Sequence, residues 1–267
     1  MNLYFKKYGN GIPLVLIHGL FGNSDNWMLF SKNISERLPV AVYSLDLRNH
    51  GRSGHHPVFS MEALIDDLAE FLDTNNIENP ILMGHSLGGK IILNYLKEPV
   101  SKDVKSVIIA DMGMRSHEMK YHHVELLYMM KNTPLESFSD RKEIENYFSE
   151  KIPSQRLAQF VLKNIKRNAE NTFSWKINLE AIDLYLDRLI GKVDYDSPHQ
   201  VPALFLKGAE SDYINEEDRQ IISENFLNSE IVEIPKAGHW LHSENPIDFE
   251  NEIFEFLEKK ISIITQG

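Results

Sequence analysis

A serine between two glycines is the part of the sequence whose chemistry is easiest to name. Gly84-His85-Ser86-Leu87-Gly88 follows a short apolar run at 80–83 and precedes a helical pattern at 87–96. A G-x-S-x-G segment between a strand and a helix forms a tight turn that presents the serine hydroxyl at the end of the strand. The N–H groups at the start of the helix stabilise negative charge that develops there. We therefore predict that Ser86 is a nucleophile.

A serine hydroxyl becomes a useful nucleophile only when a nearby base removes its proton, and histidine is the usual base. The sequence contains eleven histidines, of which His239 stands in the short segment Ala237-Gly238-His239-Trp240. This segment directly follows the last strand-like run of the chain, so its loop can reach the same sheet edge as Ser86. We predict that His239 is the base.

A glycine-containing loop upstream is a candidate for binding an oxyanion. His18-Gly19-Leu20-Phe21-Gly22 directly follows the apolar run at 13–17. A loop in this place can supply one N–H group, while the residue after the nucleophile supplies the other. The expected donors are Leu20 and Leu87, and Phe21 is a less favoured alternative to Leu20.

Composition excludes several other classes of protein. The 267 residues are 42% hydrophobic and 25% charged, and they include no cysteine. Disulfides, thiolate zinc sites and a cysteine nucleophile are therefore excluded, and no metal site is expected. The formal net charge of −11 argues against nucleic acid as a partner. Neither a signal peptide nor an apolar run long enough to span a membrane is visible, so we expect a cytoplasmic protein.

The elements that must position these residues alternate between strand-like and helix-like segments. This order predicts an α/β fold with a mostly parallel sheet flanked by helices. The alternation breaks at 112–198, where the pattern indicates several helices, at 117–131, at 140–150, from Pro153 to 165 and at 178–189. We expect a core made of 1–111 and 199–267, with 112–198 inserted as a helical cap that acts as a lid. The strand-like segments are 3–8, 13–17, 40–45, 80–83, 104–110, 202–206 and 231–234.

The chain resembles the α/β-hydrolases over nearly its whole length. Four segments carry the resemblance: PLVLIHGLFGNSDNW at 13–27, SLDLRNHGRSG at 44–54, GHSLGGK at 84–90 and PKAGHWLHSENP at 235–246. They look most like a subgroup of small bacterial and mitochondrial esterases that act on acyl esters and acyl thioesters. Arg48 to Ser53 match a stretch typical of that subgroup, and we expect them to form a structural loop near the site.

The resemblance also bears on the acid that would orient the histidine. Most of the family places this acid three residues after a glycine that ends the second-last strand. Here the glycine is Gly208, and the third residue after it is Ser211. In the esterase subgroup the acid instead ends the strand after the nucleophile helix, which corresponds to Asp111. We predict Asp111 as the acid with Ser211 as an auxiliary group, and Asp212, one place beyond the usual position, stays open as an alternative.

Together these residues predict a serine esterase with a Ser-His-Asp triad. Its substrates would be small-molecule carboxylic esters or thioesters of small acyl groups, cleaved through an acyl-enzyme without a cofactor. The same fold hosts other chemistries, so hydrolysis of carbon–carbon bonds and perhydrolysis are alternatives. A protein that keeps the fold only to bind a ligand is a third alternative.

Overall fold

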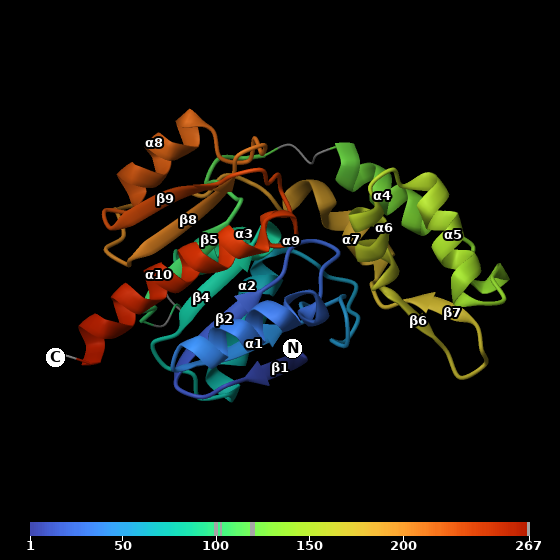
Figure 1. The fold of residues 1–267 in the computed structure, drawn as a ribbon, viewed down its shortest axis with the longest axis horizontal. Coiled ribbons are helices and arrows are strands. Elements are labelled where there is room, and N and C mark those ends of the chain that lie inside the picture. The colour runs from blue at the N-terminus through green and yellow to red at the C-terminus, as the bar shows by residue number, and fades with distance from the viewer. Residues whose placement is uncertain (99–100, 102, 118–120, 266–267) are drawn as a thin grey trace.

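A seven-stranded sheet forms the centre of the molecule (Figure 1). The computed structural model describes residues 1–98, 101, 103–117 and 121–265. The strand order is β1-β3-β2-β4-β5-β8-β9; β1 is antiparallel to β3 and all other pairs are parallel. Each strand-like segment of the sequence forms one of these strands. Their bounds are β1 Phe5–Tyr8, β2 Ile12–Ile17, β3 Val40–Leu45, β4 Ile81–His85, β5 Ser106–Ala110, β8 Ala203–Gly208 and β9 Ser229–Ile234.

The central strands are apolar throughout because helices cover both faces of the sheet. On one face pack α1 (Met28–Arg37) and α10 (Pro246–Thr265), whose apolar side chains share a cluster with β2, β4 and β5. The other face packs against α2 (Met61–Thr74), α3 (Leu87–Tyr95) and α8 (Glu216–Asn225). The expected α/β architecture is confirmed.

Parallel pairing brings the carboxyl ends of distant segments to one edge of the sheet. Ile17 of β2 pairs with Gly84 of β4, and His85 of β4 pairs with Ala110 of β5. Ala110 in turn pairs with Leu206 of β8. The residues that follow these strands, including the candidate site residues, therefore meet at that edge.

The chain between β5 and β8 forms a separate lobe, on the right in Figure 1. It contains helices, as expected, and also a small antiparallel hairpin of β6 and β7. The lobe also contains two short 3-10 helices, at Leu135–Ser137 and Leu186–Arg188. The core contains a third, at Ser24–Trp27, and the short helix α9 (Leu241–Glu244). The bounds of the lobe's elements are α4 Tyr121–Lys131, α5 Arg141–Lys151, α6 Gln155–Leu162, β6 Ile165–Arg167, β7 Phe173–Trp175 and α7 Leu179–Tyr185.

Two of the expected cap helices are shorter than the sequence pattern indicates. The helix expected to run to Ile165 ends at Leu162, and Ile165 lies in β6. The reason is Asn164, whose buried amide donates to Phe21 O at 2.7 Å and accepts from Asn23 Nδ2 at 3.1 Å. These bonds tie the lobe to the loop after β2 and turn the chain away from the helix axis. The helix expected at 178–189 is regular only to Tyr185.

The start of the helix expected at 117–131 includes 118–120, which lie outside the described residues. The division into 1–111, 112–198 and 199–267, and the movement of the lobe as a lid, stay predictions. No helix among the described residues is both long and apolar enough to cross a membrane.

Candidate active site

Ser86 stands in a turn that only glycine neighbours allow. Its backbone has φ of +52°, a left-handed conformation that is strained for a serine. A Cβ atom on Gly84 would come within 2.3 Å of the Gly88 carbonyl carbon. A Cβ atom on Gly88 would come within 2.2 Å of the Ile17 carbonyl oxygen. Gly84 therefore lets the start of α3 pack on β4, Gly88 lets it pack on β2, and Ser86 is held at the end of β4.

The structure brings Ser86 and His239 into contact although 153 residues separate them. His239 Nε2 lies 2.9 Å from Ser86 Oγ, and His239 Nδ1 lies 2.8 Å from Asp111 Oδ2. All three side chains are buried. The arrangement of hydroxyl, imidazole and carboxylate allows a proton to move from the serine to the histidine while the carboxylate stabilises the resulting cation.

Asp111 is held in place by its own hydrogen bonds. It follows β5 with φ of +50°, and its Oδ1 accepts from Gly208 N at 3.0 Å. Its Oδ2 also accepts from the Ser211 hydroxyl. Burial raises the pKa of Asp111 to about 6, although the bonds from Ser211 and Gly208 act in the opposite direction.

The structure thus places Asp111, and not Asp212, at the imidazole. Asp212 is exposed, while the Nδ1 atom of His239 is occupied by Asp111. The Ser211 hydroxyl donates to the Asp111 carboxylate and thus acts on the histidine through the acid. The catalytic roles of these groups stay predictions.

Two further residues hold His239 in place, and the sequence pattern assigned no role to either. The Tyr213 ring stacks on the His239 ring at 4.0 Å between centroids. His85 Nε2 donates to the His239 carbonyl at 2.7 Å. Burial lowers the pKa of His85 to about 3, so its ring stays neutral. The position of His85, directly before Ser86, was the only signal in the sequence that could have found it.

The loop after β2 passes directly beside the serine. A Cβ atom on Gly19 would lie 3.1 Å from Ser86 Cβ. The Phe21 N–H donates to His50 Nε2 at 3.2 Å and is therefore occupied. In the described part of the chain no acceptor is recorded for the N–H of Leu20 or of Leu87. Leu20 and Leu87 therefore stay the predicted oxyanion donors, whereas the Phe21 N–H is already bonded to His50.

The stretch from Arg48 to Ser53 supports this loop. Burial lowers the pKa of His50 to about 3, which keeps its Nε2 atom free to accept from Phe21. Arg48 makes two hydrogen bonds to the buried carboxylate of Asp67 on α2, which anchors the stretch to the core. These contacts position the loop after β2, and a purely structural role for the stretch stays a prediction.

Lys90 is a buried cation that the sequence analysis did not single out. It lies on α3, one turn after Ser86, with no exposed surface. Its Nζ donates to Gly113 O at 2.9 Å and to Arg115 O at 2.8 Å, in the segment directly after Asp111. Lys90 therefore connects the helix that begins at Ser86 to the start of the lobe.

Burial lowers the pKa of Lys90 from 10.5 to about 7, which predicts a pH-dependent stability. Between these values the unfolded chain binds more protons than the native state, so the free energy of unfolding rises with pH. We expect urea unfolding at pH 7, 8 and 9 to show this rise, and Lys90→Met to show a smaller one. Lys163→Met, at an exposed site, is the control. Equal slopes for the native protein and Lys90→Met would contradict the prediction.

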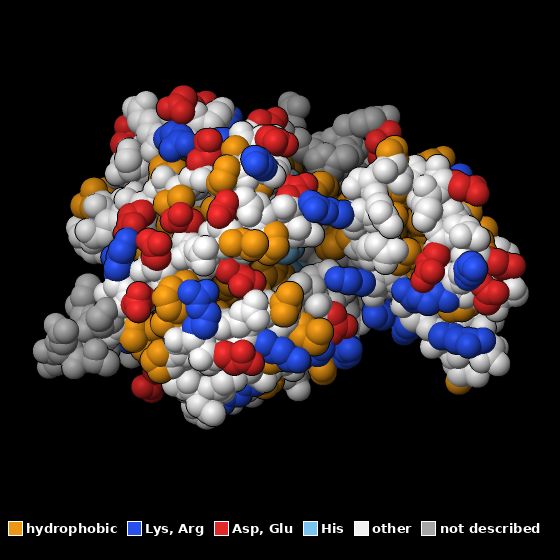
Figure 2. All heavy atoms as spheres, in the orientation of Figure 1, with side chains coloured by type: hydrophobic (Ala, Val, Ile, Leu, Met, Phe, Trp, Pro, Cys, Tyr) orange, Lys and Arg blue, Asp and Glu red, His pale blue; other side chains and the backbone are white. Residues whose placement is uncertain are grey.

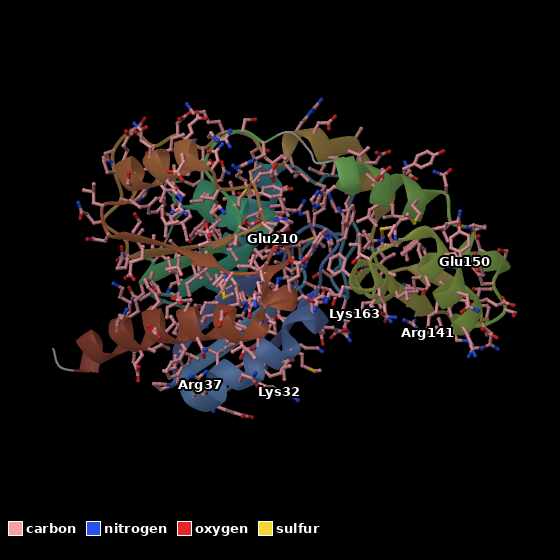
Figure 3. The ribbon with its side chains drawn as sticks, turned by 45° about the horizontal axis from the view of Figure 1, so that its top comes forward. Lys32, Arg37, Arg141, Glu150, Lys163 and Glu210 are labelled. Atoms are coloured by element: carbon pink, nitrogen blue, oxygen red, sulfur yellow. The ribbon has the colours of Figure 1, made fainter. Side chains whose placement is uncertain are left out.

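Among the described residues, no group of three or more His, Asp or Glu side chains is placed to hold a metal ion. The hollow at Ser86 lies where the core meets the lobe. Figure 2 shows the surface indented between the core and the lobe, with a histidine visible inside the indentation and basic side chains at its edge. Lys163, at the end of α6, lies on the side of the lobe that faces the core (Figure 3).

Known proteins resemble the chain along most of its length. The family model described as alpha/beta hydrolase fold matches residues 12–246. The sn-1-specific diacylglycerol lipase ABHD11 of Danio rerio is 31% identical over 95% of this chain and 81% of that protein. The esterase YbfF of Escherichia coli is 27% identical over 89% of each chain. A solved structure titled marine microorganism esterase has a TM-score of 0.88 and 37% identity, and covers 95% of this chain and 98% of that one.

The parallel sheet, the serine turn and these matches define the class of the protein. The chain belongs to the α/β-hydrolase family, and within it to the esterase-type enzymes.

Proposed function

We propose that the protein cleaves carboxylic esters by a Ser-His-Asp acyl-enzyme mechanism. The observation that carries the proposal is the continuous chain of contacts from Ser86 Oγ through His239 to Asp111 Oδ2. Ser86 attacks the acyl carbon while His239 Nε2 takes the hydroxyl proton, and Asp111 stabilises the imidazolium. The N–H groups of Leu20 and Leu87 stabilise the oxyanion of the tetrahedral intermediate.

The same groups complete the reaction. His239 donates its proton to the leaving alcohol, which departs and leaves the acyl group on Ser86 Oγ. A water molecule then attacks the acyl carbon while His239 takes its proton. His239 returns this proton to Ser86 Oγ as the bond between Oγ and the acyl carbon breaks, and the carboxylic acid is released. No step needs a group from outside the chain other than water.

The relatives support esters as the substrate class, since they are named as esterases and a lipase. Thioesters follow the same mechanism with a thiol as leaving group and are the second proposed class. Cytoplasmic location stays a prediction from the sequence.

Labelling with a fluorophosphonate probe tests the proposal against its alternatives. The probe should add to Ser86, as peptide mass spectrometry would show, and the protein should hydrolyse p-nitrophenyl acetate. A ligand-binding protein without activity would give neither result. Cleavage of a diketone with no measurable ester hydrolysis would instead favour the carbon–carbon hydrolase.

The pH dependence of hydrolysis should report the Asp111–His239 pair. Because burial raises the pKa of Asp111 to about 6, its carboxyl group becomes neutral below that pH and no longer stabilises the imidazolium. We expect kcat/KM to fall below about pH 6, measured between pH 4.5 and 8.5 at constant ionic strength.

Ser211→Ala tests this prediction, because it should shift the acidic limb of the pH profile in a known direction. The hydroxyl of Ser211 donates to Asp111 and thereby lowers the pKa of that carboxyl. Its removal should move the acidic limb of the profile to higher pH, whereas Asp212→Asn should leave the limb in place. A limb that stays fixed in Ser211→Ala, or moves to lower pH, would contradict the assignment.

A further inference from the structure

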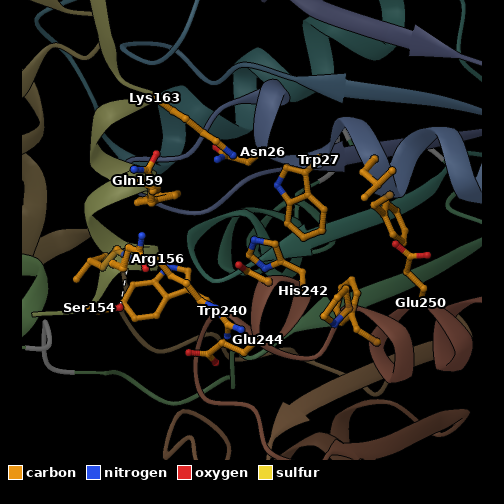
Figure 4. A pocket seen from close by; sticks show the side chains of 18 residues that line it. Asn26, Trp27, Ser154, Arg156, Gln159, Lys163, Trp240, His242, Glu244 and Glu250 are labelled. Atoms are coloured by element: carbon orange, nitrogen blue, oxygen red, sulfur yellow. Dashed lines mark hydrogen bonds between the residues drawn. The ribbon is translucent and has the colours of Figure 1, made fainter. Parts of the chain in front are cut away.

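A large cavity lies beside the candidate site, between α1, α6 and the start of α10 (Figure 4). Its volume is about 510 Å³, within the usual range for small-molecule sites. Core and lobe both contribute to its walls. The apolar part of the lining consists mainly of Trp27, Phe30, Leu157, Phe160, Trp240 and Phe249.

The hollow at Ser86 is far smaller. It measures about 10 Å³ and is enclosed by apolar side chains that include Leu20, Met112 and Leu189. This is close to the room that one water molecule needs. An ester therefore reaches Ser86 only when part of this enclosure moves.

A third hollow shares lining residues with both. It also measures about 10 Å³, and it shares Leu20 with the hollow at Ser86. With the large cavity it shares Trp27, Phe160 and Trp240, among others. Leu20 therefore lies between the two small hollows, and the side chains of Phe160 and Trp240 lie between the third hollow and the large cavity.

The charges at the cavity do not favour an ion of either sign. Arg156 and Lys163 are balanced by Glu244 and Glu250. Glu244 accepts from Gly238 N at 2.6 Å, and Glu250 accepts from an asparagine amide on α1 at 3.0 Å. A ligand in this cavity would therefore bind mainly by burying apolar surface.

We propose that this cavity binds a long apolar chain of the ester substrate, and that Phe160 and Trp240 form a gate between the chain and Ser86. The proposal rests on the proposed function. Each methylene group buried in the cavity should raise kcat/KM by about two- to fourfold until the cavity is filled. The chain belongs either to the acyl half or to the alcohol half of the ester, because both halves meet at Ser86.

Two substrate series test the cavity and tell these halves apart. One series is p-nitrophenyl esters from acetate to laurate, and the other is acetates of linear alcohols from ethanol to dodecanol. We expect kcat/KM to rise with chain length in one series. A flat or falling response in both series would overturn the proposal.

A variant that fills the cavity gives a sharper test. Leu157→Trp should lower kcat/KM for the long-chain ester by about tenfold and leave the shortest ester unchanged. Leu184→Trp, on an exposed side chain of α7 outside the cavity, is the matched control and should change neither. An equal effect of Leu157→Trp on short and long esters would overturn the assignment of the cavity.

Phe160→Ala tests the gate, since this side chain lies on the lobe and not among the reacting groups. It should speed labelling of Ser86 by a long-chain fluorophosphonate several-fold relative to a short one. An unchanged or reduced ratio would overturn the gate.

If the native protein neither labels nor hydrolyses any ester, the proposed function itself fails. An active, labelled protein with no chain-length response refutes only the cavity.

Discussion

Ser86→Ala is expected to lower esterase turnover by about six powers of ten while the protein still folds. The hydroxyl is the group that would form the acyl-enzyme, and its oxygen lies 2.9 Å from His239 Nε2. Alanine keeps a Cβ atom in the turn and removes only Oγ. Turnover should be measured with p-nitrophenyl acetate on protein purified from a host that lacks other esterases.

The control for Ser86→Ala is a comparison of folding and labelling. Its circular dichroism spectrum and melting temperature should match those of the native protein, and the fluorophosphonate mass shift should disappear. A folded variant that retains turnover would exclude Ser86 as the nucleophile.

Asp111→Asn should lower turnover by about four powers of ten. The asparagine amide cannot stabilise an imidazolium, and it leaves His239 in a tautomer that cannot accept the serine proton at Nε2. The structure supports this expectation through the 2.8 Å contact between Asp111 Oδ2 and His239 Nδ1. The measurement is kcat on one short-chain ester at pH 8, where the native carboxyl is charged.

Asp212→Asn is the matched variant, because it makes the same chemical change one residue from Ser211 on an exposed side chain. It should retain near-normal turnover. A collapse in Asp212→Asn together with a near-normal rate in Asp111→Asn would reverse the assignment of the acid.

Several features of the fold could be predicted because they depend on short stretches of sequence. Strand-like runs of four to seven residues, most of them apolar, predicted all seven strands of the sheet. Gly84 was informative for the same reason, since the room it needs is set by Gly88 and Gly89 in the same turn, whereas the room at Gly88 is set by Ile17 of β2. The lobe was predicted less well: α6 ends early because Asn164 bonds to Phe21, and no local pattern encodes a partner 143 residues away.

The sequence by itself determined which chemistry the chain could carry. A serine in a strand–turn–helix, a histidine after the last strand and a glycine loop after β2 indicate a nucleophile, a base and an oxyanion donor from residue type and local spacing alone. Where the sequence offered two candidate residues for one role, only the tertiary structure distinguished between them.

Two such choices, and the large cavity, depended on groups far apart in the chain. His50 occupies the Phe21 N–H and so leaves Leu20 as the available donor. The pairing of β5 with β8 sets Asp111 against Gly208, at the imidazole. The cavity between α1 and α6 exists only because lobe and core approach each other. The physical reason is common to all three: propensity and periodicity act over a few residues, whereas the distance between two side chains on different elements is fixed by packing and strand register.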